Sequence, residues 1–466
     1  MKKILLIEPE YKNKYPPLGL MKIASFHKKK GHSVYFFKGC SRELKNIIWD
    51  RIYIATLFTF YWNTTIKTIK FYRNSVRNLK DIYVGGVMAS LLKDEIQKEL
   101  SVTIVEGLLN KPGKLGYDND MLVDAMVPDY SIIEKESNSL LNYTYPTSNC
   151  YLAYATRGCI RKCDFCAVHK IEPEFSNSLS IRKQVEAIKR KYGEKKDLLL
   201  LDNNILASSN FGEIIEEIKS LGFEKGKNKF KGRVERHVDF NQGIDARLLT
   251  REKMKLLSEI AIKPLRIAFD RIQYKDIYVE KVRMAAEFGI RVLSNYILYN
   301  FDDRPEDFYE RLSINIDLNE EFKKRGLKSE IWSFPMKYSP IKGENCKNRK
   351  FVGTWWNKKY LRAIQCILIP THGIVGPKKD YFQRAFGRTV KEFRSILLLP
   401  ENYIIKREKH QLKSEELLRQ VEVLSPKEKK SYFDFINGFC NREGEAPLLT
   451  TSRLSHIYKI YKLTRE

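Results

Sequence analysis

The sequence has no long hydrophobic run. No stretch approaches the ~18 consecutive apolar residues that a membrane-spanning helix needs. Near the start, the apolar run Ile4–Ile7 is interrupted at once by Glu8 and Pro9, whereas a secretory signal carries an apolar core of about 7–15 residues. We therefore expect a protein without membrane association that stays in the cytoplasm.

Cysteine is scarce, with eight residues in a chain of 466. Secreted domains that depend on disulfides carry cysteine at a much higher density. Three of the eight lie between Cys159 and Cys166, a distribution that favours a reducing compartment and a metal site over a disulfide framework. The remaining five share no such spacing, and we expect them to be buried thiols: Cys40, Cys150, Cys346, Cys366 and Cys440.

Acidic residues are too few to balance the basic ones. The chain has 57 Asp and Glu against 84 Lys and Arg, a formal net charge of +27 at pH 7. From residue 341 onward there are 26 basic and 13 acidic residues. A surface this basic attracts polyanions such as nucleic acid, although a lysine-rich solvated surface explains the same charge. Both interpretations stay open.

The composition supports a folded protein, since 43% of the residues are hydrophobic and 12% aromatic. In the first 110 residues strand and helix signals alternate, which predicts a doubly wound parallel sheet whose ligands bind at the carboxyl ends of the strands. The expected strands are Lys3–Glu8, Ser33–Phe37, Arg51–Phe58, Ile82–Val84 and Val102–Val105, and the expected helices are Leu18–Lys30 and Thr64–Leu79.

Residues 111–149 have the composition of a linker, and a second alternating region covers residues 150–340. Six repeats of strand and helix predict an α/β partial barrel of the TIM type, (βα)6, with its chemistry at the carboxyl ends of the strands. Residues 341–466 are expected to form a basic, mostly helical domain. The expected strands of the barrel are Leu152–Thr156, Leu198–Leu201, His237–Asn241, Leu265–Phe269, Val292–Tyr299 and Ile331–Pro335.

The strongest signal is a C-x3-C-x2-C run formed by Cys159, Cys163 and Cys166, directly after the first of these strands. Three thiolates on one loop can bind three irons of a [4Fe–4S] cluster and leave the fourth iron open to another ligand. Gly158 suits a backbone that bends sharply before the first cysteine. The alternative is a zinc site in which His169 is the fourth ligand.

Here the chain resembles the radical S-adenosylmethionine (SAM) superfamily, whose signature is this C-x3-C-x-aromatic-C loop. The resemblance implies that Cys159, Cys163 and Cys166 bind a [4Fe–4S] cluster and that SAM chelates its open iron. One electron then cleaves SAM to methionine and a 5′-deoxyadenosyl radical, which abstracts hydrogen from the substrate. Phe165 matches the aromatic position near the adenine. A flavodoxin or ferredoxin as electron donor is implied as well.

Further SAM contacts follow from the resemblance by their place at strand ends. Asp202, Asn203 and Asn204 stand where the family holds the SAM amino group, commonly with Gly-Gly-Glu. Asp and Gln suit ribose hydroxyls and Arg suits a carboxylate, although helix caps and ion pairs are the alternative roles. On this basis the remaining candidates for SAM contacts are Gln242, Asp245, Arg247 and Asp270.

The first region is similar to the cobalamin-binding domain of one radical SAM subclass. The similarity rests on Pro17 and Gly19 before the first helix and on Gly85 and Gly86 at the end of a strand. Glycines there allow a corrin to approach the backbone closely. The D-x-H-x-x-G loop is absent, and Glu106-Gly107-Leu108-Leu109 replaces the common Gly-Glu-Gly-Glu turn. A sheet that has lost the cofactor, or that docks substrate, is the alternative.

Together these features predict a radical SAM enzyme that modifies an unidentified substrate, by C-methylation if cobalamin is bound. One alternative is a radical SAM enzyme without cobalamin that modifies nucleic acid or peptide. Another is a non-catalytic zinc or iron–sulfur protein that binds nucleic acid. Aromatic residues near the C-terminus either stack on bases or form core, among them Trp355, Trp356, Phe382 and Phe386.

Overall fold

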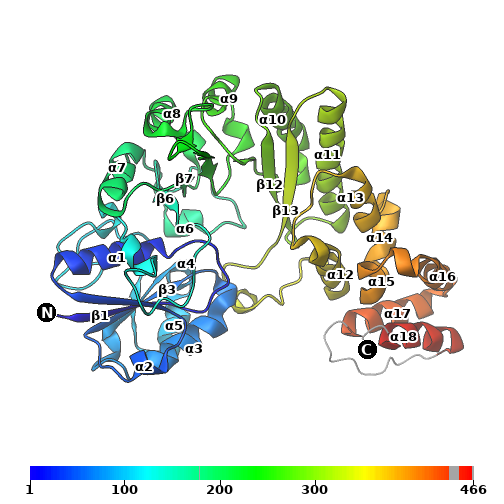
Figure 1. The fold of residues 1–466 in the computed structure, drawn as a ribbon. Helices are drawn as coiled ribbons and strands as arrows, with labels where there is room; N and C mark the ends of the chain where they lie inside the picture. Colours follow the sequence, from blue (N-terminus) through cyan, green and yellow to red (C-terminus); the bar gives the residue numbers. More distant parts are fainter. Residues whose placement is uncertain (178, 440–450, 464–466) are drawn as a thin grey trace. The chain divides into compact units, whose positions relative to one another are not determined.

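The computed structural model describes residues 1–177, 179–439 and 451–463 (Figure 1). The chain divides into two compact units. Unit 1 comprises residues 1–244, 248–263 and 339–351, and unit 2 comprises residues 245–247, 264–338 and 352–466. Both units contain parallel β-sheet and α-helix, so the expected mixed α/β class is confirmed.

Unit 1 begins with a five-stranded parallel sheet in the order β2-β1-β3-β4-β5. The order changes direction between β1 and β3, and ligands of such sheets bind at the carboxyl edge beside that point. The strands are β1 (Lys3–Glu8), β2 (Ser33–Lys38), β3 (Arg51–Thr56), β4 (Ile82–Gly86) and β5 (Thr103–Val105). The connecting helices are α1 (Leu18–Lys29), α2 (Arg42–Lys45), α3 (Trp62–Tyr72), α4 (Val87–Leu91) and α5 (Lys93–Glu99).

The centre of this sheet is formed by continuous apolar runs, as expected for parallel strands covered on both faces. Ile4 to Ile7 of β1 are completely buried. Helix α3 ends at Tyr72, seven residues before the predicted end at Leu79. It stops there because the following residues pair with another segment: the Ser75 carbonyl accepts from Trp49 N, and Val76 forms a bridge with Trp49.

Residues 111–149 follow the sheet and pack against α1. Asp129 N donates to the Met21 carbonyl at 3.0 Å, and Ser25 Oγ donates to the Val127 carbonyl at 2.6 Å. Two short 3-10 turns, η3 (Val123–Ala125) and η4 (Tyr130–Ile133), belong to this segment. It therefore forms part of the packed structure of unit 1.

The six strands predicted for residues 150–340 are all present, but they form two three-stranded parallel sheets. In unit 1 the order is β10-β7-β6, from β6 (Cys150–Ala153), β7 (Asp197–Leu200) and β10 (Val238–Phe240), accompanied by helices α7 (Ile181–Tyr192), α8 (Phe211–Ile218) and α9 (Arg251–Ser258). In unit 2 the order is β11-β12-β13, from β11 (Leu265–Arg266), β12 (Val292–Tyr299) and β13 (Glu330–Lys337), accompanied by helices α10 (Lys275–Glu287) and α11 (Pro305–Lys324). A single barrel sheet stays a prediction.

After residue 351 the described chain of unit 2 contains helices and turns, as expected. Three of the aromatic side chains considered for base stacking, Trp356, Phe382 and Phe386, belong to its hydrophobic core and are at most 5% exposed. Trp355 is half exposed and lies beneath the guanidinium of Arg304. The helices are α12 (Lys358–Leu368), α13 (Lys379–Phe386), α14 (Val390–Leu398), α15 (Glu401–Ile405), α16 (Gln411–Glu422), α17 (Pro426–Phe439) and α18 (Ser452–Leu463).

In the described part of the chain, none of the helices combines the length and the apolar character needed to cross a bilayer. Among the isolated cysteines, Cys346 and Cys366 are buried, as predicted, and Cys150 is partly buried. The prediction is wrong for Cys40, which is exposed because it follows the end of β2 in a surface turn. Cys440 lies outside the described residues.

Candidate active site

The three clustered cysteines lie on the loop that leaves the carboxyl end of β6 and leads to the short helix α6 (Val168–Ile171). Cys159, Cys163 and Cys166 are partly buried and form no disulfide. Cys166 N donates to the Cys163 carbonyl at 3.0 Å, which closes a tight turn. Arg161 N donates to Cys159 Sγ at 3.3 Å. The loop therefore presents its thiols from a compact backbone, with Phe165 between the second and third cysteines.

Gly158 is required by the geometry of this loop. Its φ is +73°, and a Cβ added there would lie 2.2 Å from the carbonyl oxygen of Glu174. Beside it, Arg157 and Ser176 exchange two backbone hydrogen bonds of 3.0 Å. The cysteine loop is thus closed against residues 172–176 at a distance that no larger residue permits.

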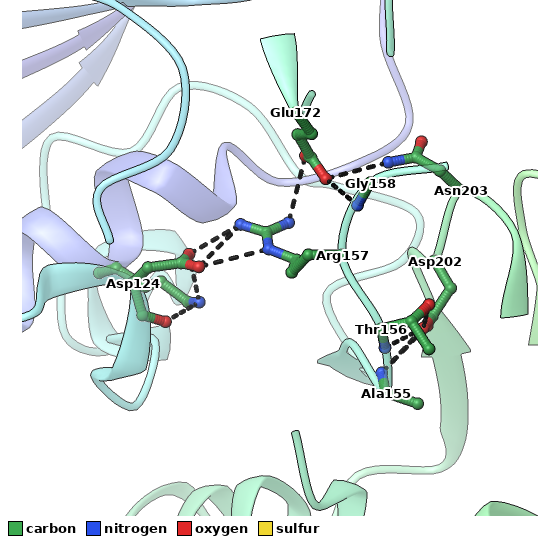
Figure 2. Close-up of polar contacts among 9 residues, drawn as sticks. Asp124, Ala155, Thr156, Arg157, Gly158, Glu172, Asp202 and Asn203 are labelled. Carbon is green, nitrogen blue, oxygen red and sulfur yellow. Dashed lines mark hydrogen bonds and ion pairs between the residues drawn. The ribbon is translucent and has the colours of Figure 1, made fainter. Parts of the chain in front are cut away.

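Asp202, at the end of β7, holds the backbone that leads into the cysteine loop (Figure 2). Its carboxylate accepts from Ala155 N at 2.9 Å, from Thr156 N at 2.5 Å and from Thr156 Oγ1 at 2.7 Å. Burial raises the pKa of Asp202 to about 6, although these donors favour the charged form. The carboxylate of Asp202 is therefore already engaged within the chain. Its predicted contact with SAM stays a prediction.

The next two residues point toward the same loop. Asn203 Nδ2 donates to Glu172 Oε2 at 3.2 Å, and Asn204 Nδ2 lies 3.5 Å from Cys159 Sγ. Asn204 Oδ1 is buried and has no hydrogen-bond partner within the described chain. Hydrogen bonds to the sulfurs tune iron–sulfur clusters, so Asn204 suits a cluster on Cys159.

In unit 2, three of the predicted SAM contacts lie close together. Arg247 Nε and Nη2 bind the two carboxylate oxygens of Asp245 at 2.7 and 3.0 Å. Burial raises the pKa of Asp270 to about 6, against the opposing charges of Arg311 and Arg247. Gln242 belongs to unit 1, where it follows β10 and is exposed. The assignment of these residues to SAM stays a prediction.

The glycines predicted to face a corrin have two different environments. A Cβ on Gly86, whose φ is +104°, would lie 2.3 Å from the Thr56 carbonyl oxygen, and a Cβ on Gly85 would lie 3.4 Å from Val105. Contacts within the sheet therefore explain this pair. A Cβ on Gly19 would meet nothing within 4 Å, so the first turn of α1 beside Pro17 leaves space.

Among the residues described, no three His, Cys, Asp or Glu side chains lie close enough to hold one metal ion. In a [4Fe–4S] cluster each cysteine binds a separate iron, so the three thiols do not have to reach one metal ion. Three partly buried thiols and the N–H donors that face Cys159 fit that group. The Nδ1 of His169 is buried and finds no hydrogen-bond partner in the described part of the chain, so the zinc alternative also stays open.

Two acidic residues outside the predicted site, Asp124 and Glu172, also lie beside the cysteine loop. Asp124 and Glu172 both bind the guanidinium of Arg157, two residues before Cys159 (Figure 2). They lie 33 and 15 residues from Arg157 along the chain, so no local spacing could have identified them.

No family model matches the chain, and no curated protein matches its sequence. Among solved structures, the fold is similar to TsrM from Kitasatospora setae, a radical SAM methyltransferase solved with its tryptophan substrate and the SAM analogue aza-SAM. The TM-score is 0.50 at 11% identity, with 79% of this chain and 77% of TsrM covered. HydG, a maturase of [FeFe]-hydrogenase, matches with a TM-score of 0.31 at 16% identity, covering 48% of this chain and 49% of HydG. At 11% identity the likeness to TsrM is one of fold alone.

Proposed function

We propose that this protein is a radical SAM enzyme that reductively cleaves SAM at a [4Fe–4S] cluster. The observation that carries the proposal is the C-x3-C-x2-C loop at the carboxyl end of a parallel strand, in a chain whose fold is like a radical SAM methyltransferase over 79% of its length. The two parts of this observation are independent, because fold comparison at 11% identity does not depend on the cysteine motif.

The chain's own residues have separate roles in this proposal. Cys159, Cys163 and Cys166 hold the cluster, Gly158 permits the turn and Asp202 fixes the backbone before it. When bound, the cluster supplies the electron that splits SAM into methionine and a 5′-deoxyadenosyl radical.

The test is anaerobic reconstitution with iron and sulfide, followed by an assay of reductant-dependent 5′-deoxyadenosine formation from SAM. The wild type is expected to bind about four irons per chain, as a [4Fe–4S] cluster requires, and to form the product. Cys163→Ala is expected to lose both properties. Cys40→Ala, at an exposed cysteine outside the loop, is the matched control and should behave as wild type.

A colourless protein that binds one zinc per chain and forms no 5′-deoxyadenosine would contradict the proposal. It would favour the non-catalytic zinc-binding alternative, with His169 beside the cysteines. In that case His169→Ala would reduce zinc binding. In an iron–sulfur enzyme, His169→Ala should leave the iron content unchanged.

A second candidate function is cobalamin-dependent C-methylation. Two observations favour it: the doubly wound order β2-β1-β3-β4-β5 offers a ligand-binding carboxyl edge, and the similar structure TsrM is a methyltransferase. The glycines add no support of their own, because Gly19 is exposed to solvent and Gly85 and Gly86 are explained by the sheet itself. Reconstitution with hydroxocobalamin, followed by measurement of bound corrin, tests this candidate. A protein without corrin that still forms 5′-deoxyadenosine would be a radical enzyme of another kind.

The substrate class that we propose first is nucleic acid, with peptide as the alternative, and the electron donor is a flavodoxin or ferredoxin. The net charge of +27 supports the choice of a polyanion. If the protein binds nucleic acid through 6–10 phosphate contacts, its affinity for nucleic acid should fall by about 10³–10⁵ between 50 and 200 mM salt. An affinity that does not depend on salt would favour a peptide.

A further inference from the structure

A buried network of charges adjoins the cysteine loop (Figure 2). Its centre is Arg157, which is 9% exposed and precedes Cys159 by two residues. Arg157 Nη2 lies 2.9 Å from both carboxylate oxygens of Asp124, and Nε lies 3.3 Å from Oδ2. On its other side, Nη1 lies 3.5 Å from Glu172 Oε1. One guanidinium therefore joins two carboxylates from distant parts of the sequence.

On the first side, Asp124 connects the network to the five-stranded sheet region. Asp124 belongs to η3, and its Oδ1 lies 3.1 Å from the Nζ of Lys22 on helix α1. Lys22 also donates to the backbone carbonyl of Asp124. Although burial would raise it, Lys22 and Arg157 hold the pKa of the Asp124 carboxyl below its usual range.

On the second side, Glu172 connects the network to the loop itself. Its Oε2 accepts from the backbone N–H of Gly158 at 2.7 Å and from Asn203 Nδ2 at 3.2 Å. Gly158 immediately precedes Cys159, and Asn203 immediately precedes Asn204, which faces the Cys159 sulfur. The carboxylate of Glu172 thus fixes two segments on either side of the first cysteine.

The four charged side chains balance one another, with Lys22 and Arg157 positive and Asp124 and Glu172 negative. Arg157 also packs on the Tyr154 ring, with its guanidinium carbon 3.9 Å from the centroid. Removal of one partner from a buried charge group is costly, because it leaves an uncompensated charge in the protein interior. The network therefore favours one conformation of the loop strongly over others.

We propose that Asp124 and Glu172 are positioning residues for the cluster: through Arg157 and the Gly158 N–H they hold the cysteine loop in its binding conformation and connect it to helix α1. This inference rests on the proposed iron–sulfur function. Neither residue is a ligand. Their role is to fix a backbone whose three thiols must reach three irons at once, and residues that orient metal ligands typically change metal affinity by 10–100-fold.

The test uses the full chain with Asp124→Asn or Glu172→Gln, which keep side-chain size and remove the charge. After anaerobic reconstitution we expect iron to be lost to a chelator about 10–100-fold faster than from the wild type. The electron paramagnetic resonance spectrum of the reduced cluster, and its change on addition of SAM, should differ from the wild type. Asp124→Glu, which restores the charge, should recover the wild-type spectrum in part.

Asp118→Asn is the matched control. Asp118 lies on the same segment and also pairs with a buried arginine, Arg51 Nη1 at 2.7 Å, and with Lys2 Nζ at 2.6 Å, so its ion pairs lead to the starts of β3 and β1. This variant should lower stability and leave the cluster spectrum and iron retention unchanged. If Asp124→Asn and Glu172→Gln match Asp118→Asn in iron retention and spectrum, the positioning role is wrong. If the wild type binds zinc and no cluster, the proposed function itself fails.

Discussion

Gly158 has two separate reasons to be glycine, and a pair of variants can separate them. Its φ of +73° disfavours any side chain, and an added Cβ would also lie 2.2 Å from a backbone oxygen. At Gly193 the φ is +76°, but a Cβ would meet nothing within 4 Å. Gly193→Ala should therefore cost only the strain of its positive-φ backbone (φ 76°, ψ 174°), about 1–3 kcal/mol.

Gly158→Ala should cost more than Gly193→Ala in urea unfolding and should also lower the iron content after reconstitution, because the clash displaces the backbone next to Cys159. Gly193→Ala should keep the wild-type iron content. Equal effects of the two variants would show that the close approach to Glu174 is not required.

His27 on helix α1 predicts a pH dependence of stability. The side chain is completely buried, and its Nε2 lies 2.9 Å from the hydroxyl of Tyr53. Burial lowers the pKa of His27 to about 3, so the folded protein keeps it neutral. Below the unfolded pKa of about 6.5, the unfolded chain takes up a proton that the folded chain does not, and stability is lost as the pH falls from there toward 3.

The measurement is the free energy of unfolding in urea at pH 7, 6 and 5 for the wild type and His27→Gln. Between pH 6 and 5 the wild type should lose about 1 kcal/mol more than the variant, since one group accounts for at most 1.4 kcal/mol per pH unit. Burial also lowers the pKa of His32, whose Nδ1 lies 2.9 Å from the Nδ1 of His27, so the difference between the two proteins reports on the titration of this pair. Parallel pH profiles would mean that His27 is solvated.

At the scale of elements, the segment before the second alternating region closes an open strand edge. β6 lies at the edge of the sheet β10-β7-β6. The Tyr130 hydroxyl of η4 donates to the Cys150 carbonyl at 2.8 Å and accepts from Leu152 N at 3.0 Å. One side chain thus satisfies two backbone groups that a neighbouring strand would otherwise bind.

Tyr130→Phe should therefore lower the free energy of unfolding by about 1–3 kcal/mol, the cost of leaving buried polar groups without a partner. Because the same strand leads to the cysteine loop, hydrogen exchange at Leu152 should accelerate in this variant. Tyr117→Phe removes a hydroxyl from a side chain that is 93% exposed and should change neither quantity. An unchanged exchange rate at Leu152 in Tyr130→Phe would argue against the edge contact.

Elements with a clear apolar pattern could be predicted from the sequence alone. The strands Lys3–Glu8 and Val292–Tyr299 match the structure at both ends. The predicted end of α3 at Leu79 is wrong because of a contact between distant parts of the sequence: Val76 forms a β-bridge with Trp49. Local patterns specify where a segment is apolar, but a partner elsewhere in the chain decides where it ends.

The same division applies to the candidate site. The cysteine loop could be predicted because all three thiols lie within eight residues. The roles of Asp124 and Glu172 could not, because they depend on packing between α1, η3 and the loop. The occupied carboxylate of Asp202 is a further example, since two of its donors, Ala155 N and Thr156 N, are backbone groups that carry no sequence signal.

For the whole molecule, the sequence predicted a partial barrel of six strands, which stays a prediction, and the structure pairs these strands in two three-stranded sheets. Six similar strand and helix repeats give no information about which neighbours pair. β11 is only two residues long, Leu265–Arg266, and its pairing is with β12. Strand pairing over long sequence separations is a property of the packed chain, which periodicity alone does not specify.

The division into two units predicts how cluster binding stabilises the chain. Cys159, Cys163 and Cys166 all belong to unit 1, and each unit has its own hydrophobic core, such as Leu5 and Ile54 in unit 1 and Phe308 and Ile364 in unit 2. A ligand that binds only the folded state stabilises by about 2.7 kcal/mol at a concentration 100 times its dissociation constant.

Hydrogen exchange of the full chain, with and without the reconstituted cluster, can measure this stabilisation in each unit separately. Exchange of β6 and β7 should slow by up to about 100-fold on cluster binding, the factor that corresponds to 2.7 kcal/mol. Exchange in α12 and α14 of unit 2 should change little, because their core contains no cluster ligand. Equal protection of both units would mean that the chain unfolds as one cooperative body. If cluster binding slows exchange in neither unit, the cysteine loop opens while the sheet of β6 and β7 stays folded. In that case the contacts of Asp202 and Glu172 do not couple cluster binding to the stability of unit 1.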